Sequence, residues 1–303
     1  MESFPDYLLP LAVALLLSAC AGNGPETTDF TPENSFTEGI EGPAVNADGN
    51  LFAVNYSEQG TIGKVEPDGV ASVFLKLPEG SIGNGIRFDL SGNMYIADYM
   101  GHSVYKVPKG SETASVWARD STMNQPNDLA ISPEGNIYLS DPKWADSTGQ
   151  IWFLGQDRKL RKLESGMGTT NGIEVSPDGK KLYVNESVQR NVWQYDIARD
   201  GSVSGKTLLL AFKDYGMDGM RCDRDGNLYI ARYDKGTVAV VSPQGQLLEE
   251  ITLKGKKPSN ITFGGKDGRN CYVTLADRGC IEMFRASLPG NYFTQVKQSQ
   301  MQH

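Results

Sequence analysis

The feature that most constrains the fold of this 303-residue chain is an internal repeat. One pattern occurs six times, at intervals of 41 to 47 residues: a polar residue, a short apolar run, a turn ending in glycine, and a second apolar run. A clear copy is TNGIEVSPDGKKLYVNES, Thr170 to Ser187. Self-similarity at a period of this length indicates a repeat architecture, because one such unit cannot bury its apolar face without its neighbours.

Each repeat predicts four antiparallel strands. The turn inside each copy ends in glycine, as in Asp178-Gly179, because glycine accepts the positive φ that a tight hairpin requires. A second hairpin follows, for example over Gly60 to Leu77. Four strands in roughly 40 to 45 residues is the size of one propeller blade. We therefore predict an all-β fold, a single six-bladed β-propeller over residues 37–303, with strand material from one chain end completing a blade.

The N-terminus predicts export. Leu8 to Ala19 is an apolar run too short to span a bilayer, and it resembles the core of a signal peptide covering residues 1–20. It ends in LSAC, which resembles a bacterial lipobox, although the preceding residues lack Lys and Arg. Two interpretations stay open, a lipid anchor on Cys20 and an ordinary cleaved signal. We expect a periplasmic or cell-surface lipoprotein, with residues 21–36 as a flexible tether.

Composition excludes several classes of function. The net charge of −8, with no cluster of Lys or Arg, argues against nucleic acid and anionic membranes as partners. The cysteines after Cys20 lie in apolar runs at irregular spacing, which favours buried thiols over a disulfide framework or a metal site. With only two histidines, His102 and His303, a Ser-His-Asp triad and a His-ligated zinc site are disfavoured.

The repeats place one polar side chain per blade around the central axis. This residue opens the innermost strand of each blade, and the innermost strands line the channel of a propeller. The six ring residues are Glu41, Asn84, Asn127, Asn171, Asp218 and Ser259. The loops between the second and third strands reach the same face. We therefore predict a pocket at this end of the channel, with those loops as its wall.

The ring residues offer only oxygen ligands at their acceptor atoms: two carboxylates, three carboxamides and a hydroxyl. Converging carboxylates repel one another and are poorly solvated unless a cation lies between them. Hard oxygen ligands favour calcium, with zinc, manganese and magnesium as alternatives. Two simpler roles for the ring stay open: each Asn-Gly or Asp-Gly pair only starts a strand, or a structural ion plugs the channel. The first of these roles does not account for Glu41.

Four segments together resemble the senescence-marker-protein/gluconolactonase/regucalcin family of six-bladed, calcium-dependent lactonases. They are EGPAV, PNDLAISPEGNIYLSDP, TNGIEVSPDGKKLYV and DGMRCDRDGNLYIA, and the match covers essentially everything after the tether. The resemblance implies that Glu41, Asn171 and Asp218 bind the metal, that Asn127 lies at the metal or the substrate, and that Asp218 also accepts a proton. Diisopropyl-fluorophosphatase-like phosphotriesterases share nearly the same four residues, so the ligands alone leave the substrate open.

On this basis we expect a calcium-dependent hydrolase of lactone-like esters. The metal would polarise the carbonyl and stabilise the oxyanion, and Asp218 would act as general base. Asn84 would hold a substrate hydroxyl or a metal-bound water. The alternative is a metal-stabilised propeller that binds a partner without catalysis. The one-sided ring, with strong ligands in the first, fourth and fifth blades and only Ser259 in the sixth, favours the enzyme.

Three further residues are candidates for substrate contact. Gln125 stands where several family members carry an arginine that binds a sugar hydroxyl, which puts sugar-acid lactones in doubt as substrates. Trp144 lies in the longest wall loop, where it would either stack on the substrate or cap the edge of its blade. His102 lies in another wall loop, as a substrate contact or proton shuttle, or as a solvated loop residue.

Overall fold

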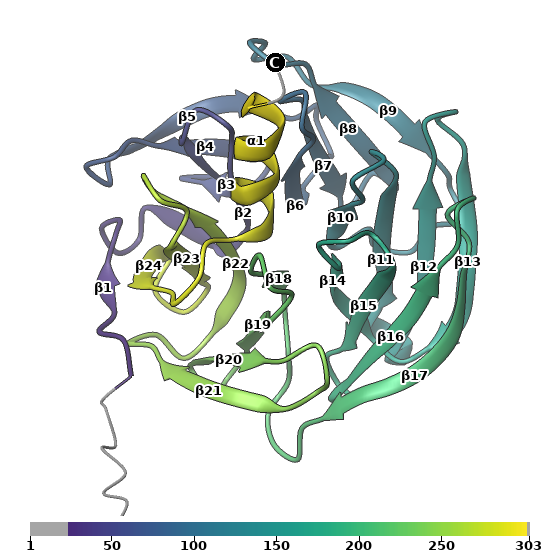
Figure 1. The fold of residues 1–303 in the computed structure, drawn as a ribbon. Coiled ribbons are helices and arrows are strands. Elements are labelled where there is room, and N and C mark those ends of the chain that lie inside the picture. Colours follow the sequence, from purple (N-terminus) through teal and green to yellow (C-terminus); the bar gives the residue numbers. More distant parts are fainter. Residues whose placement is uncertain (1–23, 302–303) are drawn as a thin grey trace, which may run out of the picture.

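The computed structural model describes residues 24–301, and the predicted signal peptide and Cys20 lie outside this range. Six four-stranded antiparallel sheets stand around a central axis (Figure 1). The predicted six-bladed β-propeller is confirmed. Within residues 24–301, no helix has the length and apolar character needed to cross a membrane.

Each of the first five blades uses four consecutive strands, from the axis to the rim. Blade 1 contains β2 (Phe36–Val45), β3 (Leu51–Tyr56), β4 (Thr61–Val65) and β5 (Ala71–Lys76). Blade 2 contains β6 (Gly83–Phe88), β7 (Met94–Asp98), β8 (Ser103–Val107) and β9 (Ser115–Arg119). Blade 3 contains β10 (Leu129–Ile131), β11 (Ile137–Lys143), β12 (Thr148–Leu154) and β13 (Leu160–Met167), with the short 3-10 helix η1 (Trp144–Asp146) between β11 and β12.

The remaining blades follow the same plan. Blade 4 contains β14 (Thr170–Val175), β15 (Lys181–Glu186), β16 (Asn191–Ile197) and β17 (Val203–Ala211). Blade 5 contains β18 (Met220–Cys222), β19 (Leu228–Arg232), β20 (Thr237–Val241) and β21 (Leu247–Thr252). Blade 6 contains β22 (Pro258–Gly264), β23 (Asn270–Leu275), β24 (Cys280–Arg285) and the short β1 (Thr28–Asp29).

Apolar contacts between neighbouring blades form the core. Every residue of the inner strand β14 is buried, whereas no residue of the rim strand β17 is. Between blades 1 and 2, Val54 and Ile62 lie in one buried cluster with Ile86. Burial of this apolar surface is the main favourable contribution to folding, so the ring of blades and its axis are fixed together.

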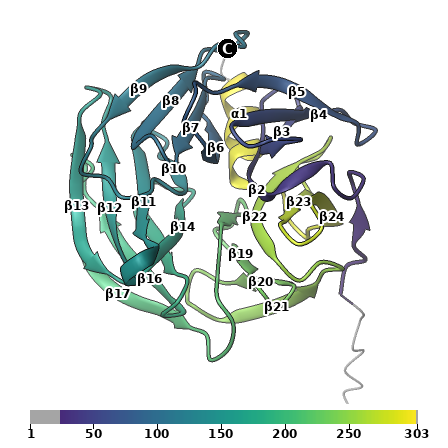
Figure 2. The same cartoon turned by 180° about the vertical axis from the view of Figure 1, so that it is seen from behind.

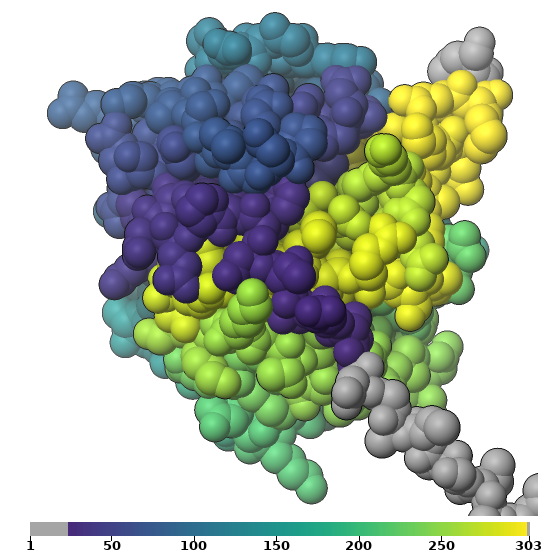
Figure 3. Space-filling model, turned by 90° about the vertical axis from the view of Figure 1, so that its left-hand side faces the viewer, coloured from purple at the N-terminus to yellow at the C-terminus, as the bar shows by residue number. Residues whose placement is uncertain are grey.

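The N-terminal segment closes the ring. Strand β1 pairs antiparallel with β24, with Thr28 opposite Met283 and Asp29 opposite Glu282. In Figure 3 the purple N-terminal segment lies against the yellow C-terminal strands. The Arg278 guanidinium also contacts the Asp29 carboxylate at 2.7 and 3.0 Å. The prediction of a flexible tether over residues 21–36 is therefore wrong for Thr28–Asp29, because these residues form the outer strand of blade 6.

The C-terminal helix α1 (Asn291–Met301), which the repeat pattern does not predict, covers one end of the channel (Figures 1 and 2). A small cavity of about 70 Å³ lies beneath it, lined by Tyr292 and Gln295 of the helix and by channel residues including Arg87 and Arg221. The opposite end of the channel carries the predicted ring. The channel is therefore covered on one face and accessible on the other.

Candidate metal-binding and active site

A cavity of about 300 Å³ opens at the uncovered end of the channel. Five of the six ring residues line it: Glu41, Asn84, Asn127, Asn171 and Asp218. Each comes from a different blade. Trp144, Tyr99 and Met100 contribute wall positions from the loops. The predicted pocket, ring and wall therefore occur at one place.

Glycine after the ring residue allows the blades to converge. A Cβ atom on Gly42 would lie 2.1 Å from the Asn84 carbonyl oxygen of the next blade, and one on Gly172 would lie 2.5 Å from the Asp218 carbonyl oxygen. The Gly85 N–H donates to the Asn127 carbonyl at 2.8 Å across the same kind of junction. Glycine is needed here because the backbone of one blade passes directly against the ring residue of the next.

Three buried ring oxygens have no hydrogen-bond donor among the described residues: Glu41 Oε1, Asn127 Oδ1 and Asn171 Oδ1. The orientation of the Asn171 amide is fixed, because its Nδ2 donates at 3.0 Å to Ser187 Oγ, whose own hydrogen is given to the Met217 carbonyl. A buried polar atom without a partner costs about 1–3 kcal/mol. A cation between these three oxygens would satisfy all of them at once.

The two ring carboxylates are electrostatically unfavourable without a positive charge. Burial raises the pKa of Asp218 to about 8. A hydrogen bond from Asn171 lowers this pKa, and the nearby charge of Asp128 raises it. Burial also raises the pKa of Glu41 well above its usual range, with the charges of Asp218 and Asp128 adding to the effect. A divalent cation would reverse this preference and keep both groups ionised.

The donor set fits a hard cation. Nowhere in residues 24–301 do three or more His, Cys, Asp or Glu side chains gather as a metal-binding group. The cavity instead combines the carboxylates of Glu41 and Asp218 with the carboxamides of Asn127 and Asn171, whose oxygens have no donor among the described residues. Calcium accepts such mixed oxygen ligands at flexible geometry, whereas zinc prefers nitrogen and sulfur.

The other predicted residues are placed differently. Asn84 lines the cavity and donates from Nδ2 to the Asn127 carbonyl at 3.1 Å. Trp144, 37% exposed, also lines it from η1. Gln125 does not line the cavity, but its Oε1 accepts from the Trp144 N–H at 3.4 Å and so supports the wall loop. His102 also lies outside the cavity lining, in a turn with φ 52°.

Ser259, the ring residue of blade 6, does not reach the cavity. Its Oγ donates to the Ile40 carbonyl at 2.7 Å and lies 2.8 Å from Thr274 Oγ1. The prediction of six converging ring residues is therefore corrected to five, because this short side chain is bound to the backbone of blade 1. The next residue, Asn260, faces the axis instead and donates to Glu41 Oε2 at 2.8 Å.

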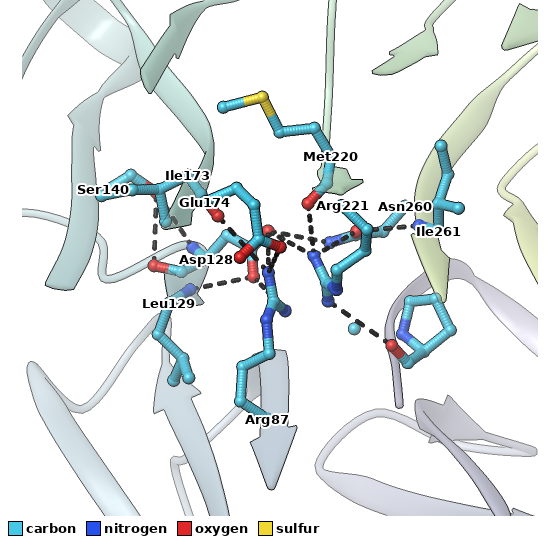
Figure 4. A network of polar contacts seen from close by, with 12 residues as sticks. Arg87, Asp128, Leu129, Ser140, Ile173, Glu174, Met220, Arg221, Asn260 and Ile261 are labelled. Carbon is cyan, nitrogen blue, oxygen red and sulfur yellow. Dashed lines mark hydrogen bonds and ion pairs between the residues drawn. The ribbon is translucent and has the colours of Figure 1, made fainter. Parts of the chain in front are cut away.

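A buried charge cluster below the ring is absent from the sequence-based prediction (Figure 4). Asp128, fully buried, accepts from Arg87 Nη1 at 2.9 Å and from Arg221 Nη1 at 3.2 Å. Glu174 lies 4.0 Å from Arg87. Arg87, Glu174 and Arg221 each follow a ring residue by three positions. Charged residues recurring inside the apolar runs GIRF, GIEV and GMRC were the signal that could have revealed this second layer.

Comparison with known proteins identifies the family. Residues 27–277 match the family described as SMP-30/Gluconolactonase/LRE-like region. A gluconolactonase of Zymomonas mobilis is 28% identical over 272 residues, covering 78% of this chain and 76% of that protein. A diisopropyl-fluorophosphatase of Loligo vulgaris is 28% identical over 289 residues, covering 84% of this chain and 91% of that protein.

Solved structures agree on the fold. A luciferin-regenerating enzyme has a TM-score of 0.75 with this chain at 21% identity, covering 88% of this chain and 97% of that one. At this identity the likeness shows the fold alone. The family match spans most of the chain and includes the five ring residues that line the cavity. The chain therefore belongs to the SMP-30/gluconolactonase/LRE-like family, as its motifs indicate.

Proposed function

We propose that this protein is a lactone hydrolase that depends on a divalent cation, with calcium as the metal. The observation that carries the proposal is a set of three buried oxygens, without hydrogen-bond donors in residues 24–301, on residues that line one open cavity with Asp218. The gluconolactonase of Zymomonas mobilis supports the reaction class. A metal that only stabilised the channel would not require this open, partly aromatic wall.

Each residue has a distinct role in the proposed reaction. Glu41, Asn171 and Asp218 would hold the cation, with Asn127 completing the set. When bound, calcium supplies a Lewis acid for the ester carbonyl. Asp218 removes the proton of the attacking water as general base, a role that typically contributes 10²–10⁴-fold to rate. Asn84 orients a substrate hydroxyl or a water from the neighbouring blade.

The wall favours a neutral lactone ring. The cavity lining contains no Lys, Arg or His within residues 24–301. Trp144 and Tyr99 offer flat apolar surface, and Gln59 offers a neutral hydrogen-bonding group. We therefore propose that Trp144 stacks on the ring, and that Gln125 acts on the substrate indirectly by supporting Trp144. His102 is not assigned a role in this mechanism, because it lies outside the lining.

Calcium removal tests this proposal. Chelation should abolish turnover of a panel of neutral lactones, and added calcium should restore it. Asp218→Asn should lower kcat/KM by at least about 10²-fold, the usual effect of losing a general base. Glu41→Ala should also lower kcat/KM, because it removes a metal ligand. Asp178→Asn is the matched control, since it removes a carboxylate from an exposed turn on the opposite face. Full activity of both site variants would reject the proposal.

A second reaction belongs in the same assay. The diisopropyl-fluorophosphatase of Loligo vulgaris covers more of this chain than the gluconolactonase does. A phosphotriester placed beside the lactones therefore tests a phosphotriesterase on the same site. Calcium-dependent stabilisation without turnover of either ester class would assign the protein to metal-stabilised, non-catalytic binding. Export and lipidation of Cys20 remain predictions, which labelling with a radioactive fatty acid in the producing cell would test.

A further inference from the structure

Two opposite blades depart from the glycine rule of the ring. In blades 1, 2, 4 and 5 the ring residue is followed by glycine, whereas Asp128 follows it in blade 3 and Asn260 in blade 6. The space for these two side chains comes from neighbouring glycines. A Cβ on Gly85 would lie 2.7 Å from Asp128 Oδ1, and one on Gly219 would lie 2.0 Å from Asn260 Cγ. The repeat therefore leaves room on the axis for two side chains from opposite blades.

All the hydrogen-bonding positions of the Asn260 amide have partners. Its Nδ2 donates to Glu41 Oε2 at 2.8 Å and to Asp128 Oδ2 at 3.3 Å. Its Oδ1 accepts from Arg221 Nη1 at 3.1 Å and from the Ile261 N–H at 2.8 Å (Figure 4). The residue is fully buried. Because its oxygen takes two donors, the orientation of the amide is fixed and the nitrogen must face the two carboxylates.

This bridge determines which oxygen of Glu41 is free. Oε2 accepts from Asn260 Nδ2 and from the Gly42 N–H, and Oε1 is left buried without a donor among the described residues. The same Nδ2 stands between Glu41 and Asp128 and so reduces the repulsion of the two carboxylates. Arg87 and Arg221 balance the charge of Asp128 from below. The carboxylate of Glu41 is thereby held through Oε2, and Oε1 is the oxygen left to bind a cation.

We propose that Asn260 is a positioning residue for the metal site: it holds Glu41 so that Oε1 is presented to the cation, and it contributes no ligand itself. The inference rests on the proposed metal site. Blade 6 therefore takes part in the site through Asn260 rather than through its ring residue Ser259. Outer-shell partners of this kind are typically worth 10–100-fold in metal affinity.

Asn260→Gly tests the proposal, because glycine is the residue that four other blades carry at this position. Calcium affinity would be measured by titration calorimetry on chelator-treated protein, at a temperature where circular dichroism shows both proteins folded. We expect Kd to rise about 10–100-fold with the stoichiometry unchanged. Turnover of the variant should be regained at high calcium, since kcat at saturating metal does not depend on Asn260.

Glu174→Gln is the matched control. It also alters a polar side chain of the buried axis cluster, but Glu174 makes no hydrogen bond to Glu41. Its calcium Kd should equal that of the wild type. A wild-type Kd in Asn260→Gly together with a lowered Tm would overturn the proposal, because Asn260 would then act only in packing.

Two further measurements keep the outcomes separate. If Asn260→Gly does not fold, Asn260→Ser retains a small polar group, and the rise of Tm with calcium concentration reports its affinity by linkage. An unaltered calcium dependence of Tm in Asn260→Ser would contradict the positioning role. If the wild type itself binds no calcium by calorimetry, the proposed metal site fails, and the inference about Asn260 fails with it.

Discussion

In the four blades that carry it, the glycine after the ring residue is as important to the site as the ring residue itself. The backbone of Gly172 does not have a positive φ, so alanine would be disfavoured there only by steric overlap. Its added Cβ would lie 2.5 Å from the Asp218 carbonyl oxygen and 2.6 Å from Asn185 Nδ2. We expect Gly172→Ala to cost about 1–3 kcal/mol through overpacking and to displace Asp218, weakening calcium binding. Thermal unfolding and calcium titration would measure both effects.

Gly24→Ala is the control for that substitution, because its Cβ would meet nothing closer than 3.5 Å. It accounts for the general effect of alanine on the unfolded chain. Wild-type stability and calcium affinity in Gly172→Ala would mean that the blades can separate without moving the site.

At the residue scale, the repeat allowed the ring residues to be predicted from the sequence. Glu41, Asn171 and Asp218 could be placed around one axis because they occupy the same point of the repeat, although Glu41 lies inside β2 and Asp218 precedes β18. The prediction that Ser259 faces the cavity was wrong, because its hydroxyl donates to the Ile40 carbonyl of blade 1. Asn260 could not be recognised, because its role depends on a contact with Glu41, which is 219 residues away in sequence.

Among the elements, hairpins could be predicted and the two terminal elements could not. The Asp-Gly turns mark their strands locally, since their glycines take positive φ, as Gly179 does at 71°. Strand β1 has two residues, too few to show an alternating pattern. Helix α1 buries only Val296 among its described side chains and carries no charged cap, so its sequence lacks an amphipathic signal.

Strand β1 should nevertheless be essential for closure. It pairs with β24, and Arg278 contacts Asp29 and Glu33. Phe30, next to β1, packs against Tyr272 with the rings tilted by 56° and their centroids 4.8 Å apart. A chain starting at residue 34 should lose on the order of 2–4 kcal/mol of unfolding free energy relative to a chain starting at residue 24, through lost apolar burial and ion pairs. It should also self-associate through the unpaired edge of β24.

Thermal unfolding and analytical ultracentrifugation of the two chains would test this expectation. Arg278→Ala in the longer chain separates the contributions, since exposed ion pairs are worth only about 0–1 kcal/mol each. Equal stability and equal monomer content of the two chains would show that the sixth blade is complete without β1.

For the whole molecule, the channel joins an accessible metal-binding end to a covered, charged end. The family motifs predicted the metal-binding end, because they cluster at the ring. The charged end depends on residues of four blades that meet on the axis, so no single motif predicts it. The charged end should make the stability of the fold depend on pH. Burial raises the pKa of Glu174 to about 7, while Arg87 lowers it and Asp128 raises it.

The sign of that dependence follows from linkage. Because the pKa of Glu174 is higher in the folded protein than its usual value of 4.5, the folded state binds more protons between about pH 4.5 and 7. The contribution of this group to stability is therefore full below that window and is lost as the pH rises through it. At about 1.4 kcal/mol per pH unit, the loss reaches at most about 3.5 kcal/mol.

Glu174→Gln removes this proton uptake, because the amide stays neutral at every pH. Urea unfolding at pH 5.5 and 8 should therefore show a smaller fall in stability for the variant than for the wild type, with the variant the more stable of the two at pH 8. Calcium would be removed from both proteins first, so that metal binding does not contribute. Asp218 and Glu41, whose pKa values are also raised without metal, are present in both proteins and cancel from the difference. Parallel stability curves for the two proteins would show that Arg87 keeps Glu174 ionised throughout, and that the axis cluster is a closed set of ion pairs.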